Sequence, residues 1–334
     1  MNATTAHNRC TLRRTLARAA AASAIALAAD AWGTAPPALQ HEPIRPLPAV
    51  AAVDTRKAAL GERLFHEPRL SRDGTVACAS CHSLATAGTD RRARSIGLGG
   101  AAGQLNAPTV LNAAFNFRQF WDGRAATLEA QIDGPMQAAN EMGASWPRVL
   151  HFLRGSPEYA AAFDAVYADG VTRDNVKNAI AEFERTLTTP NSRFDHYLTG
   201  DADAITPAEK SGYEKFKAYG CASCHQGVNV GGNMFQRMGV IADYFAERGN
   251  ITQGDYGRYN TTGDEADRYV FKVPSLRNVE LTPPYFHDGS AQTLEEAVTA
   301  MARYQLGRPL PETDLREVVL FLKTLNGVCP ERRR

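Results

Sequence analysis

Apolar residues recur at helical spacing in parts of this chain. The stretch from Val176 to Leu187 places them three or four positions apart, which is typical of a helix facing a core. Thr206 with Glu209 forms a capping box, and the helix that it opens should end at Gly220. A second box begins at Thr293. Strand-type alternation is scarce, so we predict a mainly α fold with long loops.

The first 31 residues differ from the rest of the chain. Four arginines precede an alanine-rich apolar run over residues 19–29, which is typical of a cleaved signal peptide. An uncleaved anchor is disfavoured because a membrane span needs roughly 20 apolar residues. A twin-arginine signal through Arg13 and Arg14 is the other alternative. No later apolar stretch is long enough to span a membrane, so we expect an exported, periplasmic protein with a proline-rich leader over residues 32–50.

Composition and charge exclude few functions, but they disfavour nucleic-acid binding. With 334 residues, 44% of them hydrophobic and 22% charged, the chain resembles ordinary soluble proteins and suits two domains. Its 37 basic and 36 acidic residues nearly cancel, with or without the first 31 residues. We therefore expect no strongly basic surface for nucleic acid.

Four of the six cysteines lie in two identical C-A-S-C-H motifs, at residues 78–82 and 221–225, while Cys10 falls in the signal segment and Cys329 stands alone. In C-x-x-C-H, the thiols form thioethers to a haem and the histidine is the proximal iron ligand. A zinc site or a redox disulfide is the alternative, but two matching motifs in one exported chain favour two haem c groups. The predicted attachment residues are Cys78, Cys81, His82, Cys221, Cys224 and His225.

A second repeat has a constant offset of 166 residues. It pairs PTVLN at 108–112 with PSLRN at 274–278, FWDG at 120–123 with FHDG at 286–289, and TLE at 127–129 with TLE at 293–295. A match without gaps over these positions implies two copies of one haem domain. We predict an N-terminal domain over residues 51–200 and a C-terminal domain over residues 201–330.

The two copies differ in the second axial ligand that they offer. Met301 follows the second copy, and its thioether opposite His225 would give a six-coordinate electron-transfer haem. The alternative is that this methionine is a core residue. The first copy has Pro135 at the equivalent position, with Met136 one residue out of register. We therefore expect the haem on His82 to keep an open site.

An open haem can bind peroxide, and cleavage of peroxide needs a base to move a proton. Glu141, in GPMQAANEM, is the best-placed carboxylate, with Gln131 as a polar neighbour. From residue type alone, a surface helix residue is the better interpretation of Glu141. Trp121 could relay electrons between the haems or could be a buried structural residue.

Several stretches together resemble the bacterial dihaem cytochrome c peroxidase family, which includes MauG-like enzymes. They are FHEPRLSRDGTVACASCH, SIG, NAPTVLNAAFNFRQFWDGRAATLEAQ, GPMQAANEM, FERTLTTPNSRFDHYL and VPSLRNVELTPPYFHDGS. The resemblance runs from about residue 50 to 326. It implies two cytochrome c-like domains that reduce hydrogen peroxide, in which the His82 haem is peroxidatic. The haem on His225 and Met301 would receive electrons from a small cytochrome c or a cupredoxin.

The resemblance also implies roles for single residues. Glu141 would be the acid/base, Gln131 its pocket partner, and Trp121 would lie between the haems. A calcium ion is implied at the domain junction, and a homodimer is implied by the dimers common in the family. The calcium ligands would be Asn106 and the backbone carbonyls of Thr282 and Pro284.

The chain departs from the family pattern at one position. Many members carry a histidine after the SIG segment, which ligates the resting peroxidatic haem until the other haem is reduced. This chain has Leu98 there, and no histidine lies between His82 and His151. Because leucine cannot ligate iron, we predict a first haem that is five-coordinate or water-bound and active without prior reduction.

Two other functions fit the same motifs. A MauG-like oxidase would modify residues of a protein substrate and would use tyrosine in place of Met301, for which Tyr304 lies one turn away. A dihaem electron carrier without catalysis would need a sixth ligand on the first haem, for example Met136 or Met142.

Overall fold

The computed structural model describes residues 41–48 and 52–328, which belong to one compact unit. The predicted signal peptide, most of the leader, Cys10 and Cys329 lie outside these residues. No helix in the described part of the chain is long and apolar enough to cross a membrane.

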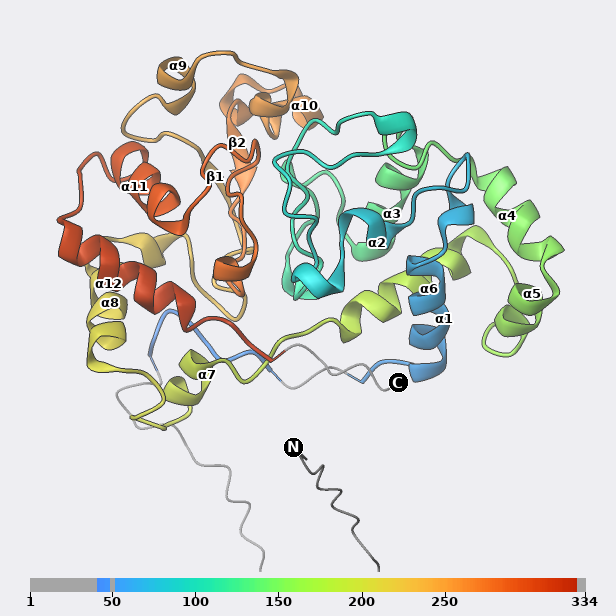
Figure 1. Ribbon diagram of the computed structural model, residues 1–334, viewed down its shortest axis with the longest axis horizontal. Coiled ribbons are helices and arrows are strands. Elements are labelled where there is room, and N and C mark those ends of the chain that lie inside the picture. The colour runs from blue at the N-terminus through green and yellow to red at the C-terminus, as the bar shows by residue number, and fades with distance from the viewer. Residues whose placement is uncertain (1–40, 49–51, 329–334) are drawn as a thin grey trace, which may run out of the picture. The chain divides into compact units, whose positions relative to one another are not determined.

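The fold is mainly α-helical, as the sequence predicted (Figure 1). The α-helices are α1 (Thr55–Phe65), α2 (Cys78–Cys81), α3 (Leu128–Gln137), α4 (Trp146–Gly155), α5 (Pro157–Asp164), α6 (Arg173–Thr186), α7 (Arg193–Leu198), α8 (Pro207–Ala218), α9 (Tyr244–Arg248), α10 (Tyr259–Thr262), α11 (Leu294–Tyr304) and α12 (Glu312–Lys323). Two short strands, β1 (Phe235–Arg237) and β2 (Val270–Lys272), pair antiparallel. Long loops and single turns connect these elements.

The predicted helix signals are confirmed to within two residues. The apolar stripe lies on α6, where Leu187 is the C-cap rather than a helical residue. The Thr206 box opens α8, which ends at Ala218, and Gly220 follows in a left-handed conformation with φ 87°. The Thr293 box opens α11.

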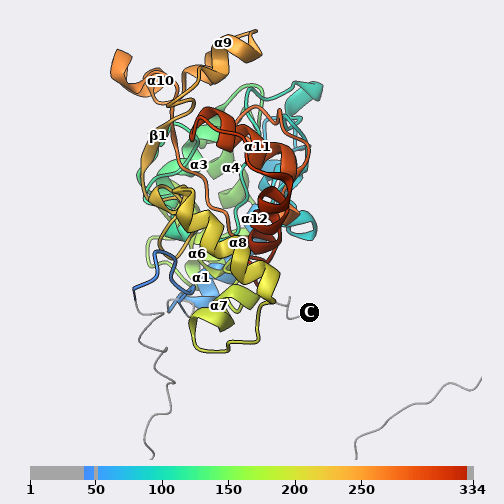
Figure 2. The same cartoon turned by 90° about the vertical axis from the view of Figure 1, so that its left-hand side faces the viewer.

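Two helix pairs cross at a glycine in the same way. A Cβ atom on Gly61 of α1 would lie 1.9 Å from the carbonyl oxygen of Ala179 in α6. A Cβ atom on Gly212 of α8 would lie 1.9 Å from the carbonyl oxygen of Glu317 in α12. Figures 1 and 2 show α8 beside α12, and α6 runs beside α1 in the other half of the chain. Glycine is therefore required for the close approach in both pairs.

Most buried apolar side chains fall into two large clusters. One contains residues from Leu60 to Leu187, and the other contains Ile44 and residues from Phe194 to Leu325. A smaller third cluster surrounds Phe245 and Phe271. The two large clusters divide near residue 190, close to the predicted domain boundary at residue 200. That boundary stays a prediction.

The 166-residue repeat extends to the backbone. Asn112 and Asn278 both have φ 60°, and Phe120 and Phe286 have φ 68° and 70°. The side-chain amides of both asparagines donate to the hydroxyl oxygen of Thr189, each at 2.8 Å. Thr189 therefore lies where equivalent segments of the two copies meet.

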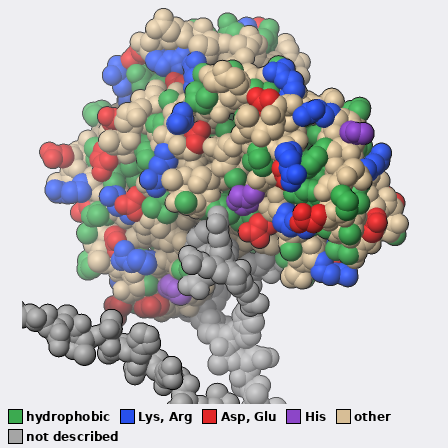
Figure 3. Space-filling view, turned by 45° about the vertical axis from the view of Figure 1, so that its right-hand side comes forward, with side chains coloured by type: hydrophobic (Ala, Val, Ile, Leu, Met, Phe, Trp, Pro, Cys, Tyr) green, Lys and Arg blue, Asp and Glu red, His purple; other side chains and the backbone are tan. Residues whose placement is uncertain are grey.

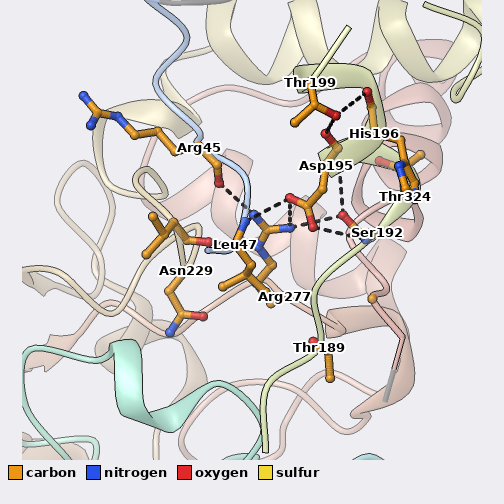
Figure 4. Close-up of polar contacts among 12 residues, drawn as sticks. Arg45, Leu47, Thr189, Ser192, Asp195, His196, Thr199, Asn229, Arg277 and Thr324 are labelled. Carbon is orange, nitrogen blue, oxygen red and sulfur yellow. Dashed lines mark hydrogen bonds and ion pairs between the residues drawn. The ribbon is translucent and has the colours of Figure 1, made fainter. Parts of the chain in front are cut away.

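Arg277 joins the leader segment to the second half of the chain (Figure 4). Its guanidinium is fully buried and donates to Asp195 Oδ1 at 2.7 Å and to the Arg45 carbonyl oxygen at 2.9 Å. The same carboxylate oxygen accepts the backbone N–H of Leu47. A buried ion pair of this kind is tolerated because its remaining donors and acceptors also have partners.

Candidate haem sites and the residues between them

Each C-x-x-C-H motif forms one tight helical turn. In the first, the backbone N–H of His82 donates to the carbonyl oxygen of Cys78 at 3.0 Å. In the second, His225 donates to Cys221 at the same distance. The turn places two thiols and an imidazole on a short, rigid segment, as covalent haem attachment requires.

The imidazole of His82 is oriented for iron ligation through Nε2. Its Nδ1 lies 3.2 Å from the carbonyl oxygen of Gly88, so Nδ1 is the natural site of the ring proton. Burial lowers the pKa of His82, which keeps the ring neutral at physiological pH. A neutral imidazole with one free nitrogen is the form that binds iron.

His225 is also enclosed by backbone carbonyls, but its Nδ1 has no hydrogen-bond partner among the described residues. A Cβ atom on Gly231 would lie 2.2 Å from the Pro274 carbonyl oxygen and 3.4 Å from Nδ1 of His225, so the proline carbonyl approaches the ring closely. Burial lowers the pKa of His225 to about 4, while the carbonyls of Val230 and Pro274 oppose this shift. Burial therefore favours the neutral form of this ring as well.

The four thiols fit haem better than zinc or a disulfide. All four are free, and burial raises the pKa of Cys78 to about 12 and that of Cys221 to about 11. Among the described residues, neither motif gathers three metal-ligating atoms within 4.8 Å of one another. A zinc site needs such a group, whereas a haem separates its thioether carbons from its iron.

Glu141 lies on a turn after α3 and not on a surface helix. The backbone N–H of Leu98 donates to the Glu141 carbonyl oxygen at 3.1 Å, so the SIG loop and the Glu141 loop are neighbours. Burial raises the pKa of Glu141, and Arg124 opposes this shift. Its charge in turn contributes to the raised pKa of Cys81, which is due mainly to burial. A half-buried carboxylate therefore lies within electrostatic range of the first haem motif.

The other residues expected near the first haem are placed as follows. Gln131 is half-buried on α3. Leu98, Met136 and Met142 are buried, 5%, 1% and 3% exposed, and belong to the first core cluster. Pro135 lies inside α3, one residue before Met136.

Trp121 connects the two copies of the repeat. Its indole N–H donates to the carbonyl oxygen of Asn106 at 2.9 Å, and its own carbonyl oxygen accepts the backbone N–H of Lys272 at 2.7 Å. Its ring meets His287 edge to face, with 6.3 Å between centroids. Trp121 and Met301 both pack against the third cluster, so a side chain of the first copy reaches the wall of the second site.

Comparison with known proteins decides the family. A sequence model described as di-haem cytochrome c peroxidase matches residues 55–203. Cytochrome c551 peroxidase of Nitrosomonas europaea is 47% identical over 87% of this chain and 86% of its own length. The chain belongs to the dihaem cytochrome c peroxidase family. Cytochrome c peroxidase Ccp of Escherichia coli is 48% identical over 87% of this chain, which spans 63% of that protein.

MauG-type members of this family are more distant. Methylamine utilization protein MauG of Methylorubrum extorquens is 34% identical over 84% of this chain and 81% of its own length. A crystal structure of a MauG-like protein associated with microbial copper homeostasis is 29% identical, with a TM-score of 0.74 over 86% of this chain and 94% of that one. Family membership implies haem c cofactors and a peroxidase, an oxidoreductase, as the sequence predicted.

The predicted calcium ligands are only partly brought together. The backbone N–H of Asn106 donates to the carbonyl oxygen of His287 at 2.8 Å, and its side-chain amide donates to Arg92. His287 follows Pro284 by three residues, so Asn106 lies against the loop that carries Thr282 and Pro284. The calcium site stays a prediction.

Sequence reasoning missed a polar cluster behind Trp121. His287 Nε2 lies 2.7 Å from Asp255 Oδ1, and Arg248 pairs with both Asp255, at 2.7 Å, and Asp288. The two carboxylates and the imidazole could ligate a metal, but the Arg248 guanidinium already forms ion pairs with both carboxylates. The only available signal was the substitution of Trp121 by His287 in the repeat. The buried Met238, in the same cluster as Met301, was also missed.

Proposed function

We propose that this chain reduces hydrogen peroxide to water with electrons from a small cytochrome c or a cupredoxin. The observation that carries the proposal is the pair of C-x-x-C-H turns, each with a half-buried histidine whose pKa is lowered, in a family of dihaem peroxidases. Each haem would supply a redox-active iron, which protein side chains alone cannot provide.

The proposal makes the His82 haem peroxidatic. Glu141 would accept a proton from bound peroxide and return it to the leaving oxygen, a step favoured by a carboxyl whose pKa is raised toward neutrality. Gln131 would orient the peroxide as a polar neighbour. Leu98, buried beside the Glu141 loop, offers no iron ligand.

The proposal makes the His225 haem the electron-accepting one. Met301 would be its second axial ligand, since it lines the third cluster from α11. Trp121 packs against the same cluster and binds Lys272 through its backbone, so it is suited to carry electrons between the two sites. His82 and His225 would each hold one haem with its cysteine pair.

Tyr304 favours the peroxidase over a MauG-like oxidase. Its hydroxyl donates to Glu247 at 3.1 Å, an exposed partner on α9, so its oxygen is engaged away from the core. The electron-carrier alternative requires Met136 or Met142 to ligate the first haem, and both are packed in the first core cluster.

Export and assembly belong to the same proposal. A cleaved signal over residues 1–31 would deliver the chain to the periplasm, where haem c is attached. The face drawn in Figure 3 carries intermixed acidic and basic side chains, which agrees with a partner other than nucleic acid. Calcium at Asn106 and a homodimer complete the proposal.

The electron paramagnetic resonance spectrum of the oxidised holoprotein, paired with peroxide turnover by the same sample, tests this function. A high-spin ferric signal beside a low-spin one, with immediate turnover, is the expected result. Two low-spin signals without turnover would mean that a side chain closes the His82 site. A reduction-activated peroxidase or an electron carrier would then be the better interpretation.

A further inference from the structure

Lys272 is a buried lysine at the end of β2. Only 6% of it is exposed, although lysine normally keeps its ammonium in water. Within residues 41–48 and 52–328, no carboxylate lies within 4.0 Å of its ammonium, and burial alone lowers the pKa of Lys272 to about 8. Burying a charge without a partner is costly, so the position calls for an anion.

The acidic residues near Trp121 and His287 are already paired. Arg124 lies 3.0 Å from Asp122, and Arg248 forms ion pairs with both Asp255 and Asp288. Among the described residues of this region, Lys272 is therefore a buried cation without a protein counter-ion.

The backbone places Lys272 on the wall of the second haem site. Pro274, two residues further, presents its carbonyl oxygen to the ring of His225 across Gly231. The intervening Val273 exchanges backbone hydrogen bonds with the loop after the second motif: it accepts from Gly232 at 2.7 Å and donates to Met234 at 3.0 Å. Lys272 therefore lies two residues from the carbonyl that approaches His225, on a strand that borders the second motif.

We propose that the ammonium of Lys272 binds a propionate of the haem attached at Cys221 and Cys224. Haem brings two carboxylates, and a propionate in this position would supply the missing counter-ion. The equivalent residue of the first copy is Asn106, which is uncharged. The ion pair would thus distinguish the two sites: a cation near the second haem favours its reduced state, as an electron-accepting haem needs.

This inference rests on haem attachment at the second motif and not on peroxidase activity. The test replaces Lys272 with Met in the holoprotein and measures the potential of the low-spin haem by spectroelectrochemistry. We expect a roughly tenfold smaller ratio of reduced to oxidised haem at the wild-type midpoint, about 59 mV for one electron. Lys272→Arg keeps the charge and should stay within about threefold of wild type.

Lys210→Met is the matched control. It also removes one positive charge from the second half of the chain, and Lys210 has no ion pair among the described residues. An unchanged ratio in Lys272→Met with two haems per chain would overturn the proposal, as would an equal shift in Lys210→Met. If Lys272→Met does not fold, Lys272→Gln and resonance Raman bands of the propionates replace it. Propionate bands identical to wild type in Lys272→Gln would also overturn the ion pair.

Discussion

Replacing Gly212 with alanine tests whether the crossing of α8 and α12 holds the second haem site in place. The new Cβ atom would lie 1.9 Å from the Glu317 carbonyl oxygen, whereas Cβ atoms essentially never come closer than 3.0 Å to another heavy atom. The two helices must therefore separate by more than about 1 Å, and overpacking of this kind costs about 1–3 kcal/mol. Alanine recovers up to about 1 kcal/mol as a helix former.

We expect a net loss of about 1 kcal/mol, which corresponds to roughly 2–4 °C in the unfolding midpoint of a domain of about 150–250 residues. The substitution should affect the second haem more than the first, because α8 ends three residues before Cys221. Gly212→Ala should broaden the low-spin signal of the second haem, whereas Gly61→Ala, at the equivalent crossing of α1 and α6, should disturb the first.

The assay is urea unfolding of the holoprotein followed by circular dichroism, together with electron paramagnetic resonance of each variant. Gly155→Ala is the control, because a Cβ atom there meets nothing within 4 Å and should leave stability unchanged or slightly higher. Equal stability of Gly212→Ala and Gly155→Ala would refute the close packing of these helices and its link to the haem.

Three further predictions concern single side chains. Glu141→Gln should lower peroxide turnover about 10²–10⁴-fold with both haems attached. It should also remove the acidic limb of the pH–rate profile, which the raised pKa of Glu141 places above the ordinary glutamate value. Near-normal turnover would exclude Glu141 as the acid/base. Leu98→His should make the resting first haem low-spin and dependent on reduction, whereas immediate turnover would show that the loop cannot deliver a ligand. Arg69 holds the pKa of Glu67 at about 2. The ion pair between them therefore stabilises the folded state above pH 4.5, and this stabilisation is lost as the pH falls through about 2. Glu67→Gln should therefore flatten urea-measured stability between these pH values, and an unchanged profile would exclude this ion pair.

The sequence predicted most of the local structure because its signals are local. Capping boxes mark where α8 and α11 begin, a 3.6-residue stripe lies along α6, and α8 ends two residues before the expected Gly220. The repeat also predicted backbone geometry, since Asn112 and Asn278 adopt the same left-handed conformation. Composition and periodicity could not predict the short β1–β2 pair, which depends on a contact between segments 35 residues apart.

The sequence predicted which residues form the candidate sites, but it did not predict what surrounds them. The haem motifs are contiguous, so the sequence displays them completely. The neutral state of His82 and His225 depends on burial, and the association of Trp121 with Met301 depends on how the two copies meet. The pairing of His287 with Asp255 and the isolation of Lys272 depend on tertiary neighbours, which periodicity does not reveal.

Substitutions at equivalent positions of one backbone explain how two similar sites could divide a reaction. Pro135 stands where the second copy has Met301, so only the second site is offered a thioether ligand. Asn106 stands where the second copy has Lys272, so only the second site gains a buried cation. In the proposed function, both differences would favour a reduced, six-coordinate second haem and would leave the first haem free to bind peroxide. Trp121, whose backbone accepts from Lys272, then lies where an electron leaving the second site would enter the first.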